Sequence, residues 1–212
     1  TILQLEKQRQ LKIQNSLNAP EFLMHNILIK HENKKLKGKI RIKGDRAIHW
    51  QNRNTTSYKI DMRKNYRIWG LEEFSIQKPI TRNYTYEYLF HKFLEETGHL
   101  SLKYFFVNLY INDENRGLYA VEESFSKELL ERQQKRNGPI FGIDEKISTS
   151  YPNVHYDLYS NEFWLEEQPS LIKSAFSILN NQKDNEKDIN IGDHFDLDKW
   201  ASFFAVIDIM GA

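Results

Sequence analysis

The feature that most constrains the fold is the run 35–43, in which basic and apolar side chains alternate. Its basic members are Lys35, Lys37, Lys39, Arg41 and Lys43. A repeat of two residues predicts a β-strand with one apolar face and one face that presents a cation roughly every 6.5 Å. Because aligned like charges repel, the basic face needs an anion, a carboxylate neighbour or open water. A polar loop leads from this strand to a second strand over 57–62, so the two predict a basic hairpin.

The rest of the pattern predicts further strands and helices in an α+β arrangement. Before the hairpin we expect a basic helix over 2–17 and a strand over 23–30. After it we expect a strand ending at 77, a helix over 82–97, and a β-hairpin made of 104–111 and 118–123. The last third predicts helices over 126–136 and 161–180, a polar loop over 180–194, and a final helix from about Asp196. That final helix is apolar almost all round, which predicts burial on every side.

These elements divide the chain into three expected segments. Residues 1–19 form an N-terminal helix or linker, residues 20–139 form a β-rich region, and residues 140–212 begin a helical region. Because the chain starts at Thr1 and ends inside an apolar run, we expect both ends to be cuts in a longer protein. No apolar run approaches the roughly 20 residues that a membrane-spanning helix needs.

Charge is distributed unevenly along the chain. Residues 1–70 hold 16 Lys and Arg against 5 Asp and Glu, whereas residues 71–212 hold 14 against 24. This asymmetry suits a first part that binds phosphate, and it equally suits two parts that attract each other. The absence of cysteine excludes disulfides, cysteine-ligated zinc and a thiol nucleophile.

Common catalytic motifs are missing from the sequence. It contains no Walker A loop, no GxGxxG, no HExxH and no GxSxG. The seven histidines lack the spacing of metal ligands, so we interpret them as structural or surface residues. No aromatic side chain is interleaved with the cations of the basic strand, which disfavours a nucleic-acid groove.

Lys59 is the lysine whose position best fits a phosphate site. It lies in the middle of the second strand and shares a face with the small residue Ser57. Glu122 and Glu123 end the later hairpin, and one of them must point inward and needs a cation. A structural salt bridge and a nucleotide site explain this lysine and carboxylate equally well.

A succession of segments resembles the CotH family, which is named for spore-coat protein H. The segments are KIRIKGD, SYKIDM, IWGLEEFSIQ, a helix that ends in Gly98, and GLYAVEESFSKELLE, of which the last is the most specific. The resemblance covers about residues 36–143, and FDLDKWASFFAVIDIMG resembles the helix that follows in the family. It implies a divergent protein-kinase-like fold, with a β-rich N-terminal lobe and the start of a mainly helical C-terminal lobe.

The resemblance also implies roles for individual residues. Lys59 corresponds to the basic position of the SYKI motif, and Glu123, four residues after Tyr119, corresponds to the family glutamate. These two are the implied catalytic residues, although Glu122 stands beside Glu123 and either could be the functional carboxylate. The implied cofactor-binding residues are Arg41, Lys43, Gly44 and Lys59.

The activity implied is ATP-dependent phosphorylation of Ser or Thr in a protein substrate, with Mg²⁺ as the metal. We expect the metal ligands and the catalytic aspartates beyond Ala212, so this stretch alone is expected to be inactive. The expected partners are a nucleotide and a protein substrate, not nucleic acid, with a possible membrane anchor outside the chain. The family suggests the cell surface or envelope. Two other functions stay open: a non-catalytic surface or coat assembly module, and a polyanion-binding module.

Overall fold

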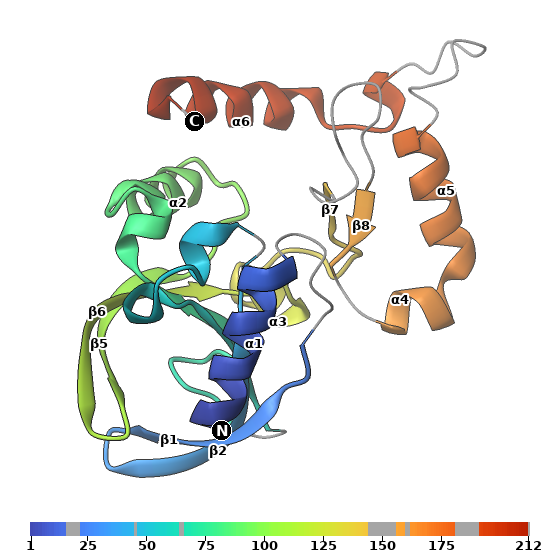
Figure 1. Ribbon diagram of the computed structural model, residues 1–212. Helices are drawn as coiled ribbons and strands as arrows, with labels where there is room; N and C mark the ends of the chain where they lie inside the picture. The colour runs from blue at the N-terminus through green and yellow to red at the C-terminus, as the bar shows by residue number, and fades with distance from the viewer. Residues whose placement is uncertain are drawn as a thin grey trace. The chain divides into compact units, whose positions relative to one another are not determined.

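The computed structural model describes residues 1–15, 22–44, 46–63, 66–143, 156–159, 162–180 and 191–211. The chain divides into two compact units, Thr1–Ser124 and Phe125–Ala212. The first unit contains a curled antiparallel sheet together with helices, and the second contains mostly helices (Figure 1). The predicted α+β class is therefore confirmed.

The first unit is built on a six-stranded sheet in the order β1-β2-β3-β4-β6-β5, in which every neighbouring pair is antiparallel. The strands are β1 (His25–His31), β2 (Lys34–Ile42), β3 (Tyr58–Met62), β4 (Glu73–Gln77), β5 (Tyr104–Ile111) and β6 (Glu114–Glu123). The basic hairpin and the later hairpin lie where the sequence predicts them. Two short 3₁₀ helices, η2 (Ala47–His49) and η3 (Arg53–Thr55), occupy the loop between β2 and β3.

One face of this sheet carries the hydrophobic core. The register places Ile40, Ile60 and Phe74 side by side across β2, β3 and β4, and none of them is more than 8% exposed. Tyr119 and Val121 of β6 belong to the same buried cluster. Burying each such side chain contributes roughly 1.5–3 kcal/mol, so this face is the main source of the unit's stability.

The opposite face is polar, because side chains alternate along each strand. Its cross-strand row runs through Arg41, Lys59, Ser75, Glu122 and Tyr104. The 3₁₀ helix η4 (Pro79–Arg82) and helix α2 (Tyr86–Glu96) follow β4. His91 of α2 stacks on Tyr104 with ring centroids 6.0 Å apart, so α2 covers this face at β5.

Helix α1 (Ile2–Asn15) packs beside β2 on the core face through Leu5. Its Gln8 side chain is 5% exposed and accepts a hydrogen bond from the backbone N–H of Ile42 at 3.1 Å. The same amide group donates to the carbonyl oxygen of Leu23 at 2.8 Å. Gln8 thus occupies the place beside the end of β2 that β1, whose pairing ends at His25, leaves empty.

In its described residues, the second unit contains short elements and two longer helices, α5 (Pro169–Asn180) and α6 (Leu197–Met210). The short elements are α3 (Lys127–Arg132), β7 (Phe141–Ile143), β8 (Tyr156–Leu158), α4 (Glu162–Glu167) and η6 (Ile191–Asp193). Most of the predicted polar loop, residues 181–190, lies outside the described residues. None of the helices in the described ranges is long and apolar enough to cross a membrane.

Helix α6 begins and ends where its sequence signals predict. The Asp196 carboxylate accepts a hydrogen bond from the backbone N–H of Lys199, and Gly211 ends the helix with φ +70°. Its all-round burial was predicted wrongly, because Trp200 is 47% exposed and Ile209 is 73% exposed. Hydropathy identifies which side chains are apolar but not which other element covers them.

Candidate functional site

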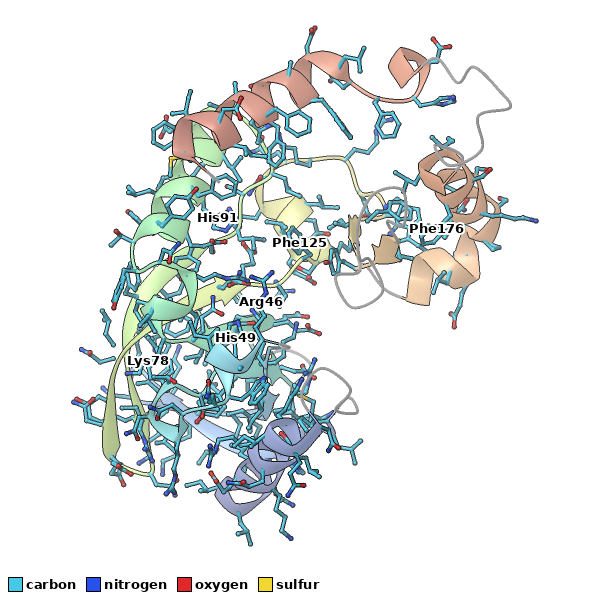
Figure 2. All side chains as sticks on the ribbon, turned by 45° about the horizontal axis from the view of Figure 1, so that its top comes forward. Arg46, His49, Lys78, His91, Phe125 and Phe176 are labelled. Atoms are coloured by element: carbon cyan, nitrogen blue, oxygen red, sulfur yellow. The ribbon has the colours of Figure 1, made fainter. Side chains whose placement is uncertain are left out.

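The candidate site lies on the polar face of the sheet in the first unit. It combines the end of β2, the middle of β3 and the end of β6 with η2 and η4. Arg46 and His49 come from the loop between β2 and β3 (Figure 2). The residues converge because β2, β3, β4 and β6 are adjacent strands. Their registers place odd-numbered residues of β2 and β3 in the same cross-strand row as Ser75 and Glu122.

An ion pair between Lys43 and Glu122 is the centre of the site. Lys43 Nζ lies 3.0 Å from Glu122 Oε1, and their side chains are only 22% and 12% exposed. The amide of Gln77 donates a hydrogen bond to the other oxygen of Glu122, Oε2. The Nε of Arg82 stands 3.8 Å from that same oxygen. One carboxylate therefore faces two cations and an amide.

Burial and charge shift the pKa values of both partners. Burial raises the pKa of Glu122, but the charges of Lys43 and Arg82 outweigh it, so the pKa is lowered overall and the carboxylate is ionised. The pKa of Lys43 is also lowered, first by burial and then by the nearby cations Arg82 and Lys59, against the attraction of Glu122. Burial thus disfavours the charged form of Lys43, and a further anion close to its ammonium would favour that form.

Gly44 follows Lys43 and has a backbone that favours glycine. Its φ is +96°, and a Cβ built there would stand 2.5 Å from the Cβ of His49. His49 is 6% exposed, and its Nδ1 lies 2.9 Å from the hydroxyl of Ser57. Burial, followed by the charges of Lys43 and Arg82, lowers the pKa of His49 to about 4. A neutral imidazole therefore packs against the backbone at Gly44.

Lys59 lies on the same face as Lys43 but has other partners. Its Nζ lies 2.8 Å from Glu73 Oε2 and donates to the hydroxyl of Ser124 at 2.8 Å. Arg41, directly opposite Lys59 in β2, also belongs to this face. The polar face thus brings together Arg41, Lys43 and Lys59 of the residues predicted from the sequence, with Gly44 next to Lys43.

Glu123 lies apart from these cations. It pairs with Phe74 of the core row, so its side chain points to the face opposite Lys59. Its Oε2 accepts a hydrogen bond from the backbone N–H of Lys103 at 2.8 Å, and it is 3% exposed. The structure therefore does not bring Lys59 and Glu123 together. Of the two neighbouring glutamates, Glu122 is the one that lies on the polar face with the cations.

Several residues of the site could not be selected from the sequence. Arg82, Gln77 and His49 belong to no motif, and they come from a 3₁₀ helix, a strand end and a loop. For Glu122 a signal did exist, because a carboxylate and a lysine that pair across a sheet must lie on the same face of it. Applying that rule requires the register between β4 and β6, which the sequence does not reveal.

The arrangement is suited to binding a phosphate group. Lys43, Lys59 and Arg82 exceed the carboxylates Glu122 and Glu73 by one positive charge, and Arg82 Nε has no hydrogen-bond partner among the described residues. Charged N–H donors of this kind bind phosphate oxygens strongly. No cluster of three or more His, Asp or Glu that could hold a metal ion occurs in the part of the chain that the structure describes.

Comparison with known protein families identifies the family of the chain. The family described as CotH kinase protein matches residues 40–212, a span that contains the whole candidate site. Helix α1, strand β1 and the first six of the nine residues of β2 precede the matched span. No curated protein matches the chain.

Proposed function

The chain belongs to the CotH kinase protein family, and from this membership and the site we propose that its first unit is the nucleotide-binding lobe of an ATP-dependent protein kinase. The acceptor would be a Ser or Thr hydroxyl of a protein substrate. The lobe is a curled sheet with the helices α1 and α2 packed on it, which is consistent with a divergent kinase-like fold. We further propose that the residues that hold the nucleotide differ in part from those that sequence resemblance implies.

The observation that carries the proposal is the partly buried Lys43–Glu122 ion pair on the polar face. Phosphoryl transfer depends on positioning and on neutralising phosphate charge, and protein kinases hold their phosphate-binding lysine with a glutamate. Lys43 and Glu122 reproduce this relationship at 3.0 Å with little exposure. Burying a lysine costs free energy. A pair with only a structural role need not bear that cost, because replacing a buried ion pair with apolar residues is often neutral for stability.

In this proposal Lys43 contacts the phosphates and Glu122 holds its ammonium in place. Gly44 keeps the backbone free of a side chain beside Lys43, and Arg82 adds a second cation. Lys59 and Arg41 contribute positive potential, with Lys59 held by Glu73 instead of Glu123. Glu123 becomes a structural residue that accepts the backbone N–H of Lys103.

When bound, ATP would supply the phosphoryl group, and Mg²⁺ would neutralise part of its charge. The residues of this chain bind and orient the phosphates and keep Lys43 protonated. An anion close to Lys43 raises its pKa, so nucleotide binding should strengthen the very charge that holds the phosphate.

Calorimetric titration of the chain with Mg-ATP tests the proposal. Lys43→Met should weaken binding by about 10- to 150-fold, the equivalent of losing one charged hydrogen bond of about 1.5–3 kcal/mol. Lys59→Met is the matched control, because it removes the same charge from the same face and should change affinity less. Equal loss in both variants would indicate a diffuse charge effect, and absence of binding in the unmodified chain would favour a non-catalytic assembly module.

A second, isosteric pair of variants separates the two glutamates. In the full-length protein, Glu122→Gln should lower the rate of phosphate transfer, because Lys43 loses the group that orients it. Glu123→Gln, one residue away on the opposite face, should leave the rate per folded molecule unchanged. The reverse order of effects would assign the functional carboxylate to Glu123.

A further inference from the structure

The outer part of the polar face, over β1 and β2, is exposed and strongly basic. It lies beyond the part that α2 covers at β5. Its side chains are Asn26, Leu28 and Lys30 of β1, and Lys35, Lys37 and Lys39 of β2, all of them exposed. We call these six residues the basic face.

The cations of the basic face are only partly neutralised by the rest of the described chain, in which Asp61 of β3 stands directly opposite Lys39. Lys35 stands directly opposite Lys30, an arrangement of like charges that is destabilising in a sheet. Lys35, Lys37 and Lys39 make no ion pair with a carboxylate among the described residues. Lys30 lies 3.7 Å from Asp113, but both side chains are more than two-thirds exposed, so this pair contributes little.

The spacing of these lysines matches one kind of partner. Alternate side chains of an extended chain are about 6.5–7 Å apart, which is the spacing of Lys35, Lys37 and Lys39 along β2. A peptide with an acidic residue at every second position can therefore place one carboxylate at each lysine. The same row continues through Arg41 to Lys43, so a peptide on this face would lead toward the candidate site.

Nucleic acid fits the basic face less well than an acidic peptide does. Single-stranded nucleic acid is held by aromatic side chains on which the bases stack, in addition to cations. The only apolar side chain of the basic face is that of Leu28, and none of its six residues is aromatic. The chemistry favours carboxylates on a peptide.

We propose that the basic face docks an extended acidic segment of the protein substrate. That the partner is a substrate rests on the proposed kinase function, whereas binding of an acidic segment does not. All six residues precede residue 40, so they lie outside the span that matches the family.

Fluorescence anisotropy with a labelled peptide, in which glutamate alternates with serine, tests the docking. The triple variant Lys35→Gln, Lys37→Gln and Lys39→Gln should bind about tenfold more weakly, from three exposed ion pairs of modest strength. The control triple removes the same charge from Lys7, Lys34 and Lys173, which are exposed and lie outside the basic face. It should change affinity less than twofold.

Three results would overturn the proposal. The first is an equal loss of affinity in the two triple variants, and the second is equally tight binding of a peptide with glutamine in place of glutamate. The third is tighter binding of a single-stranded oligonucleotide of the same charge, provided that this binding also depends on Lys35, Lys37 and Lys39. The first two would mean that the basic face has no docking role, and the third would make it a nucleic-acid site.

The same variants separate this proposal from the kinase proposal. Lys43→Met should lose Mg-ATP binding and keep peptide binding, while the basic-face triple should do the reverse. Peptide binding in a chain that binds no nucleotide would refute the kinase function and leave the docking surface standing. Nucleotide binding with no peptide binding would refute the docking alone.

Discussion

Replacing Gly44 by alanine should disrupt the site through one contact. The φ of Gly44 is +96°, and the added Cβ would stand 2.5 Å from the Cβ of His49. Such a separation cannot be tolerated, so either the loop or the imidazole must move. The imidazole is buried and lies 2.9 Å from the Ser57 hydroxyl, so its displacement also breaks that contact.

The expected cost has two parts. Forcing a side chain into a backbone region that favours glycine costs about 1–3 kcal/mol. Overpacking against His49 adds about 1–3 kcal/mol. Gly98 offers a matched control, since its φ is +74° and a Cβ there would meet nothing within 4 Å. Gly98→Ala should therefore show the backbone cost alone.

Urea unfolding followed by tryptophan fluorescence measures the difference. Gly44→Ala should lower the free energy of unfolding by about 1–3 kcal/mol more than Gly98→Ala does. Combining Gly44→Ala with His49→Ala should recover most of that excess, which a double-mutant cycle would detect as coupling. Equal destabilisation by the two alanine variants, or no coupling with His49, would refute the contact.

Two further predictions concern His49 and Gln8. The pKa of His49 is lowered to about 4 in the folded state, so the unfolded state binds more protons than the folded state between pH 4 and 6.5. Folding stability that is present above pH 6.5 is therefore lost as the pH falls toward 4. The loss should reach about 3 kcal/mol, and it should be absent from the pH profile of unfolding free energy measured for His49→Gln. Gln8→Ala leaves the N–H of Ile42 without its acceptor and should cost about 1–3 kcal/mol and accelerate hydrogen exchange at that amide. An unchanged exchange rate at Ile42 would show that α1 does not hold the end of β2.

Strand alternation made much of the first unit predictable. The repeat of two residues identified the basic hairpin, and the glycine-containing turn identified the hairpin of β5 and β6. Lys43 was placed on the basic face of the first strand, and Lys59 on the face of the second strand that it shares with Ser57, for the same reason. The choice between Glu122 and Glu123 was not predictable, because it depends on how β6 pairs with β4, and that register is a tertiary property.

Other parts of the site enter through segments with no periodic pattern. Arg82 is brought to Glu122 by a 3₁₀ turn that ends with Asn83 in the left-handed region. His49 approaches Gly44 because the loop after β2 folds back on the strand. The exposure of α6 was likewise beyond the sequence, since an apolar helix predicts a partner without identifying one.

The most direct test of the central claim is covalent labelling with an ATP analogue that carries an acyl group on its terminal phosphate. The analogue transfers that group to a lysine amine beside the bound phosphates, and peptide mass spectrometry identifies the labelled lysine. We predict labelling of Lys43 that excess Mg-ATP suppresses. Labelling of Lys59 in its place, or labelling that excess Mg-ATP does not suppress, would contradict the assignment of the Lys43–Glu122 pair as the nucleotide site.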